Sequence, residues 1–164
     1  MPMKIPPLGI VPFALASLAL LLNLSAVQTA KASSWLTNSA LTIGRYRQTT
    51  TLLQSGKILV AGGTSNGVVT NSTELFDPTT GTWAPTGALN TPRSSHTTTL
   101  LQNGKVLAVG GASGSGASEL SSAELYDPVS GVWTTTGSLA TRRTGHAATL
   151  LRNGQVLVAG GSFK

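Results

Sequence analysis

The 164-residue chain contains no cysteine. This absence excludes disulfide bonds, thiolate zinc sites, cysteine nucleophiles and a lipid anchor attached through a cysteine. Export from the cytoplasm stays open, because exported proteins do not need disulfides. A stable fold therefore has to rest on packing and hydrogen bonding.

Charged residues are also scarce, at 10% of the chain. Eleven Lys and Arg against five Asp and Glu give a formal net charge of +6, but no basic run and no basic stripe interleaved with aromatic residues occurs. We therefore expect no nucleic-acid partner. Apolar residues make up 40% of the chain, so a hydrophobic core can form and global disorder is not expected.

The first 32 residues have the layout of a secretory signal peptide. Met1–Lys4 is a short basic start, Ile10–Leu24 is almost entirely apolar, and Ala30–Ala32 places small residues where a signal peptidase cleaves. The apolar run of about 15 residues is short for a membrane-spanning helix of about 20. We predict cleavage before Ser33 and a secreted, cell-surface or periplasmic protein. An uncleaved anchor, which would bring the chain to a membrane, is the alternative.

The rest of the sequence is repetitive. Three copies of one pattern begin at Arg45, Arg93 and Arg143, so the period is 48 residues and then 50. RSSHTTTLLQNGKVLAVGG recurs as RTGHAATLLRNGQVLVAGG, and STELFDPTTGTWAPTGAL recurs as SAELYDPVSGVWTTTGSL. The additional residues of the longer repeat fall in the Gly- and Ser-rich stretch 112–118, which we interpret as a surface loop.

Each complete repeat predicts four short strands. A Thr-rich strand ends in Leu-Leu, and the Asn-Gly or Ser-Gly pair that follows predicts a tight two-residue hairpin turn. The second strand is continuously apolar and ends in two glycines, which indicates that it is covered on both faces and approached closely. The third strand stops at Asp-Pro, and the fourth carries a tryptophan that we expect to pack against a neighbouring sheet. These glycines and tryptophans are Gly62, Gly63, Gly110, Gly111, Gly160, Gly161, Trp35, Trp83 and Trp133.

Four antiparallel strands in about 45–50 residues are typical of a propeller blade. The repeat resembles the kelch family in its arginine and histidine before the first strand, its double glycine, and its Glu-x-x-Asp-Pro followed by a tryptophan. The resemblance covers Trp35–Gly161. It implies an all-β fold, a partial kelch-type β-propeller of about two and a half four-stranded antiparallel blades, preceded by an N-terminal signal helix.

The repeat boundaries predict the domain organisation. We assign residues 1–32 to the signal peptide, 33–44 to a lone outer strand of an incomplete blade, 45–92 and 93–142 to two complete repeats, and 143–164 to the first half of a third. Propellers have about four to eight blades. Because open end blades expose apolar sheet, we expect a truncated chain, a gene fragment or a ring completed by self-association.

Basic side chains gather in the loops that precede the first strands. The resemblance implies that these loops and those after the double glycines form one partner-binding face. The binding candidates are Arg45, Arg47, Arg93, His96, Arg142, Arg143 and His146. Arginines that recur in every repeat are expected to serve the blade, for example by bonding an Asp or Glu of an adjacent blade. Arg47 and Arg142 do not recur, which makes them better candidates for specificity than the recurring arginines, although we expect each to serve as solvated surface charge.

The sequence predicts no catalytic site, metal site or cofactor. His96 and His146 lack a third ligand, so we expect them to make structural hydrogen bonds. Glu74 and Glu124 recur at equivalent positions, which favours packing over the paired carboxylates of a glycosidase. We predict an exported, non-enzymatic scaffold that binds a protein or a carbohydrate. The alternative is a remnant of a carbohydrate-active enzyme, of oxidase or epimerase type, whose active site lies in missing blades; the chain has no cysteine for a copper site like that of galactose oxidase.

Overall fold

The structure is a computed structural model that describes residues 39–114 and 118–162. All regular secondary structure of these residues is β, so the predicted all-β class is confirmed. The signal helix predicted in residues 1–32 lies outside the described residues, as does Trp35. Among the described residues, no helix has the length and apolar character that crossing a membrane requires.

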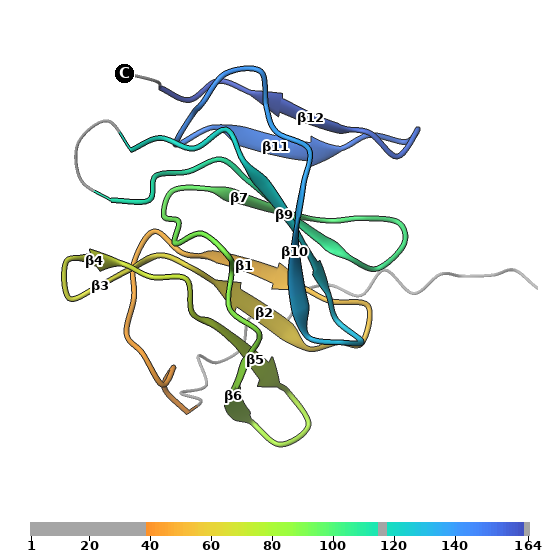
Figure 1. The fold of residues 1–164 in the computed structure, drawn as a ribbon. Helices are drawn as coiled ribbons and strands as arrows, with labels where there is room; N and C mark the ends of the chain where they lie inside the picture. The colour runs from red at the N-terminus through yellow and green to blue at the C-terminus, as the bar shows by residue number, and fades with distance from the viewer. Residues whose placement is uncertain (1–38, 115–117, 163–164) are drawn as a thin grey trace, which may run out of the picture. The chain divides into compact units, whose positions relative to one another are not determined.

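Two four-stranded antiparallel sheets contain most of the strands (Figure 1). The first consists, in order, of β1 (Thr49–Leu52), β2 (Ile58–Ala61), β5 (Thr73–Asp77) and β6 (Thr82–Thr86). The second has the same order, with β7 (Thr97–Leu100), β8 (Val106–Val109), β9 (Ala123–Asp127) and β10 (Val132–Thr136). A hairpin of β11 (Ala147–Leu150) and β12 (Val156–Ala159) matches the first two strands of each sheet. This is the architecture of a partial kelch propeller.

The turns between the first and second strands differ from the predicted two-residue hairpins. In the first repeat, the Gly56 amide donates to the Leu53 carbonyl at 2.9 Å, and the Leu53 amide donates to the Lys57 carbonyl at 2.9 Å. Three residues therefore form the loop, and only its glycine has a positive φ, of 82°. The Ser-Gly or Asn-Gly pair fits both turn types, because a type I turn followed by a left-handed glycine also places glycine last.

The glycine pairs that end the second strands have the predicted unusual backbone. The φ angles are 62° and 96° at Gly62 and Gly63, and 61° and 92° at Gly110 and Gly111. A Cβ atom at Gly62 would clash with the carbonyl oxygen of Arg93 in the next repeat. Glycine therefore allows both the left-handed conformation and the close approach of two sheets.

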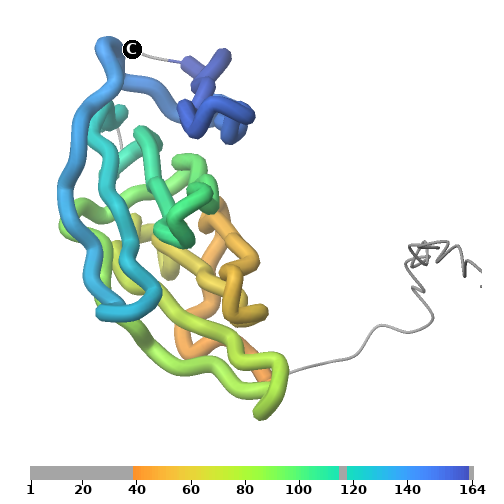
Figure 2. Tube along the Cα trace, turned by 90° about the vertical axis from the view of Figure 1, so that its right-hand side faces the viewer, coloured from red at the N-terminus to blue at the C-terminus, as the bar shows by residue number. Residues whose placement is uncertain are grey.

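The sheets stack one against the next, as Figure 2 shows. Side chains of each strand alternate between a forward face, toward the following repeat, and a rear face. A buried cluster joins the forward face of the first sheet to the rear face of the second. It comprises Leu53, Leu59, Ala61, Leu89, Val106, Ala108, Tyr126 and Trp133. Trp133 thus packs against the neighbouring sheet as predicted, and each fully buried leucine contributes about 2 kcal/mol.

The segment before the first sheet is a linker. Residues 39–44, the described part of the predicted lone outer strand, form no strand. The indole nitrogen of Trp83 donates to the Ser39 carbonyl at 2.9 Å, and the Trp83 ring lies 5.0 Å from the Phe76 ring. Residues 87–92 occupy the same place before the second sheet.

Candidate functional site

Arg93 and Glu124 form an ion pair inside the second repeat. Their side chains are 2.6 Å apart and have exposures of 0% and 1%. The guanidinium also donates to the carbonyl oxygens of Gly110 and Ser122 at 2.9 and 3.2 Å. Because the pair is enclosed and richly hydrogen-bonded, removing either partner would leave an uncompensated buried charge.

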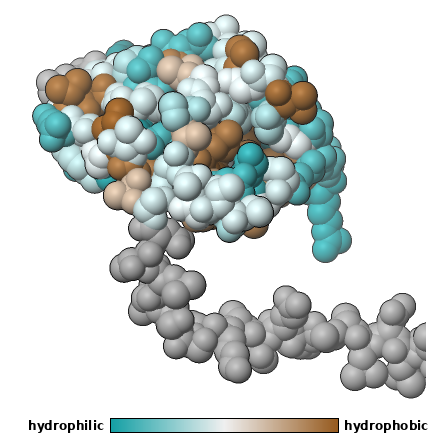
Figure 3. Space-filling model, turned by 90° about the horizontal axis from the view of Figure 1, so that it is seen from below, coloured by the Kyte–Doolittle hydropathy of each residue, from teal (hydrophilic) through white to brown (hydrophobic). Residues whose placement is uncertain are grey.

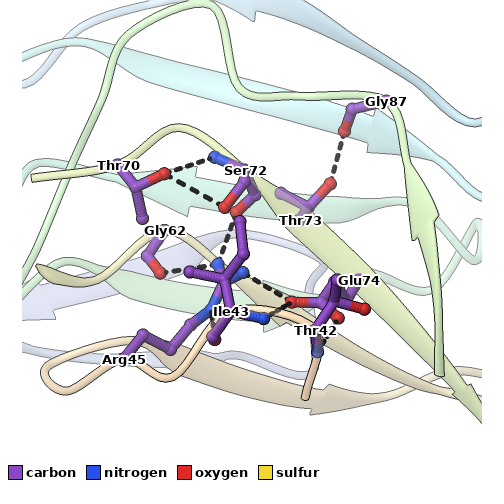
Figure 4. Close-up of polar contacts among 9 residues, drawn as sticks. All are labelled: Thr42, Ile43, Arg45, Gly62, Thr70, Ser72, Thr73, Glu74 and Gly87. Carbon is purple, nitrogen blue, oxygen red and sulfur yellow. Dashed lines mark hydrogen bonds and ion pairs between the residues drawn. The ribbon is translucent and has the colours of Figure 1, made fainter. Parts of the chain in front are cut away.

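The same arrangement recurs in the first repeat (Figure 4). Arg45 and Glu74 are 2.7 Å apart, and Arg45 donates to the carbonyl oxygens of Gly62 and Ser72. The amide of Thr42 donates to Glu74 at 2.8 Å. Burial would raise the pKa of Glu74, but the Thr42 hydrogen bond and Arg45 more than offset this and lower the pKa overall.

These contacts correct part of the prediction for the recurring arginines. Their role is architectural, but each binds a glutamate of its own repeat rather than of an adjacent blade. Glu124 also accepts hydrogen bonds from the amides of Asn90 and Thr91, at 2.6 and 3.0 Å. The pair therefore fastens the linker between two sheets to the sheet that follows. Arg143 donates to Gly160 in the same manner, at 2.9 Å.

The two histidines lie between the sheets. Nε2 of His96 and Oγ1 of Thr49 are 3.1 Å apart, and Nε2 of His146 and Oγ1 of Thr97 are 2.9 Å apart. Each bond crosses from one repeat to the previous one. Burial, with Arg93 and His146 nearby, lowers the pKa of His96 to about 3, so its ring is neutral near pH 7. Burial, with Arg143 nearby, also lowers the pKa of His146.

A backbone ladder crosses the three repeats beside these histidines. The amide of Ser95 donates to the carbonyl of Arg47 at 3.0 Å, and the amide of Gly145 donates to the carbonyl of Ser95 at 2.9 Å. All three residues have a left-handed backbone, with φ of 56°, 51° and 65°. For Arg47 and Ser95 this conformation costs about 1 kcal/mol each. The same position of all three repeats therefore has a left-handed backbone, which is strained at Arg47 and Ser95 and relaxed at Gly145.

That ladder borders an open cavity of about 900 Å³. Loops from all three repeats line it: those before the first strands, and those after the double glycines. The first of the latter contains a small hairpin of β3 (Thr64–Ser65) and β4 (Val68–Val69), where the sequence predicts only a loop. The predicted gathering of these loops on one face is thus present. Its lining comprises Tyr46, Arg47, Thr64, Gly67, Val68, Val69, Ser94, Ser95, Ala112, Ser113, Gly114, Glu119, Thr144, Gly145, Gly161 and Ser162.

Arg47 alone among the predicted binding residues, all of which are described, lines this cavity. Its guanidinium carbon lies 5.7 Å from the centre of the Tyr46 ring, a cation–π contact. Tyr46 is 53% exposed and Val68 is 70% exposed. Arg142 is exposed but lies outside the cavity lining.

Sequence reasoning missed Tyr46 and Glu119 as cavity residues. Glu119 follows the inserted stretch of the second repeat and pairs with Ala112 through a β-bridge. Neither residue recurs among the repeats. Non-recurrence, the criterion that made Arg47 a specificity candidate, would also have identified Tyr46 and Glu119. Within residues 39–114 and 118–162, no group of three or more His, Cys, Asp or Glu side chains has the arrangement of a metal site.

Comparison with known proteins agrees with the repeat pattern and the sheet stack. A family model described as Kelch motif matches residues 45–89 and 93–140, which is more than half of the chain. No curated protein matches the chain significantly. The matched segments contain the first two double glycines, both Arg–Glu pairs and both four-stranded sheets. The chain belongs to the kelch-repeat family.

Proposed function

We propose that this chain is an exported, non-enzymatic kelch scaffold that binds a protein partner at the cavity bordered by Arg47, Ser95 and Gly145. Kelch repeats are characteristic of protein-interaction scaffolds. The main support for this proposal is that the arginines have two different roles. The recurring ones are committed to the sheets, whereas Arg47 lines an open cavity to which every repeat contributes.

The chemistry of the cavity wall favours a protein ligand. Tyrosine and arginine are enriched at the energetic centres of protein interfaces, and Tyr46 and Arg47 lie side by side here. Val68 adds exposed apolar surface on the β3–β4 hairpin. A volume of about 900 Å³ accommodates several side chains of a partner loop or peptide.

Two observations support a role without catalysis. Glu74 and Glu124, the recurring carboxylates, are enclosed in ion pairs with arginine and do not line the cavity. The histidines are buried between sheets rather than presented to a ligand. Export rests on the signal-peptide pattern of residues 1–32.

The proposal is tested by selecting binders from a displayed library of linear peptides, with a glycan array screened in parallel. We expect peptides to be enriched, and Arg47→Ala to weaken their binding at least about 10-fold, because truncating an arginine at the energetic centre of an interface costs about 2 kcal/mol or more. Binding is measured by calorimetry or biolayer interferometry.

Arg142→Ala is the matched control, since Arg142 is an exposed arginine outside the cavity. It should leave the affinity unchanged. Reproducible binding of glycans without peptides would replace the protein ligand by a carbohydrate. Binding that responds to Arg142→Ala but not to Arg47→Ala would show that the site lies elsewhere.

A further inference from the structure

Glu119 differs from the other carboxylates of the chain. The chain has five Asp and Glu residues, and all of them lie in the described part. The other four form ion pairs with Lys or Arg: Glu74, Asp77, Glu124 and Asp127. Glu119 forms no ion pair with any described residue. Its acidic side chain is therefore the one whose charge the described residues leave without a partner.

The backbone, rather than the side chain, fixes the position of Glu119. Glu119 pairs with Ala112 through a β-bridge. At the same position of the first repeat, Val69 pairs with Thr64. Both Glu119 and Val69 line the cavity. Because a valine occupies the equivalent position, the repeat fold does not require a carboxylate there.

One oxygen of the Glu119 carboxylate lacks a hydrogen-bond partner. Oε2 is shielded from solvent and accepts no hydrogen bond from the described residues. Among the described residues that have such an atom, Glu119 alone lines the cavity. Buried polar atoms of native proteins almost always have a partner, so this exception indicates a partner outside the chain. The terminal torsion of glutamate is broad, so a rotation can turn Oε2 toward the cavity.

The cavity wall carries two opposite charges that do not neutralise each other. Arg47 and Glu119 are the charged residues of its lining, and they form no ion pair with each other. The other lining residues are Gly, Ala, Val, Ser, Thr and Tyr. Each of the two charges is therefore available to a ligand.

Strongly polar groups are sparse on the surface of this protein in general. On the face that Figure 3 shows, most of the coloured surface is pale, which marks intermediate hydropathy, and strongly hydrophilic residues form small separate areas. This agrees with the charged content of 10%. Where charges are so few, a single carboxylate at a binding site determines which ligand charge is favoured.

We propose that the protein partner of this cavity presents a lysine or arginine side chain to Glu119. The inference rests on the proposed function, because it names the chemistry of the ligand that the cavity binds. A cationic donor supplies the hydrogen bond that Oε2 lacks and also balances the charge, and such charge-assisted bonds are stronger than neutral ones. A neutral amide or hydroxyl supplies only the hydrogen bond, so a basic side chain fits better.

Arg47 and Glu119 together give the bound segment a direction. Arg47 attracts a carboxylate or a carbonyl oxygen of the partner, and Glu119 attracts the basic side chain. Complementary charges at an interface fix its register more than they raise its affinity. Glu119 therefore acts in the choice of partner, beside the aromatic and apolar contacts of Tyr46 and Val68.

Selection from the displayed library of linear peptides tests the inference when it is repeated on Glu119→Gln, which keeps the side-chain size and removes the charge. Peptides selected on the wild type should be enriched in Lys and Arg at one position, and those selected on the variant should not. Glu119→Arg should reverse the preference to Asp and Glu. Calorimetry with a basic peptide selected on the wild type should show binding weakened about 10-fold or more by Glu119→Gln. Replacing the basic residue of that peptide by Met should remove the difference between the two proteins.

Asp77→Asn is the matched control, because it removes one negative charge from outside the cavity lining. It should select the same basic peptides as the wild type. Equal enrichment of Lys and Arg on the wild type and on Glu119→Gln would overturn the inference, as would loss of this enrichment on Asp77→Asn as well. Both results leave the proposed function intact. A wild-type protein that enriches no peptide would overturn the proposed function and this inference together.

Discussion

Arg47 and Arg93 both lie in the segment that precedes the first strand of a repeat, but their surroundings give them different physical roles. The Arg93 side chain is fully buried and fixed by Glu124 and two carbonyl oxygens. Arg47 is exposed, contacts the Tyr46 ring and lines the cavity. Burial and hydrogen-bond partners therefore separate a structural arginine from a binding one, where residue type alone does not.

His96 makes folding stability depend on pH. Its pKa is about 3 in the folded protein because of burial, against an ordinary value of 6.5. Between these values the unfolded chain binds more protons, so stability is full above pH 6.5 and falls as the pH drops toward 3. The loss is roughly 1 kcal/mol per pH unit.

His96→Gln should remove this dependence, since Gln48 occupies the equivalent position of the first repeat. We expect the free energy of unfolding in urea to fall more steeply from pH 7 to pH 4.5 in the wild type than in the variant. Equal slopes for the two proteins would show that the ring does not carry the effect.

Residues that recur were predictable in position, and those that do not recur were predictable only in part. The double glycines, the Trp133 packing and the architectural role of Arg45 and Arg93 follow from repetition, because every sheet needs the same contacts. Tyr46 and Glu119 were missed because cavity residues are set by loop geometry, which the repeat pattern does not encode. The partner of the recurring arginines was assigned to the wrong repeat, because spacing along the chain does not show which glutamate the linker brings near.

At the scale of elements, the second strands and their terminal glycines determine how closely the sheets approach. Gly110 has a φ of 61° and lies against the next repeat, whereas Gly160 has a φ of 72° and open space. Comparing the two positions separates backbone strain from contact between sheets.

Gly160→Ala should cost about 1 kcal/mol of unfolding free energy, the strain of a left-handed alanine. Gly110→Ala should cost about 3 kcal/mol or more, because its methyl group also meets the Arg143 carbonyl and the His146 ring. Urea denaturation followed by near-ultraviolet circular dichroism measures both. Equal losses would mean that the second and third repeats are not in close contact.

The hairpin turns show where local sequence is ambiguous. An Asn-Gly or Ser-Gly pair is compatible with a two-residue turn and with a three-residue turn that ends in a left-handed glycine. The strand lengths and pairing register decide between them, and here they select the three-residue loop. The four strands of each complete repeat, in contrast, were predictable from the hydrophobic pattern and the Asp-Pro stops, whereas the short β3–β4 hairpin was not.

At the scale of the molecule, the chain uses one contact scheme repeatedly. A buried Arg–Glu pair fastens the linker before each four-stranded sheet to that sheet. A histidine–threonine bond crosses both contacts between consecutive repeats, and an aliphatic cluster fills the contact between the first two sheets. The recurring polar residues are engaged in these contacts. The residues of the loops around the cavity, in contrast, differ from one repeat to the next. Stability and recognition thus depend on different sets of residues.

The most direct test is a side-by-side measurement of unfolding free energy for Arg93→Ala and Arg47→Ala. Arg93→Ala should lose about 3 kcal/mol or more, because Glu124 would remain buried without its partner. Arg47→Ala should stay within about 0.5 kcal/mol of the wild type, as substitutions of exposed residues usually do. Equal losses in the two variants would contradict the separation of structural from binding arginines on which this account depends.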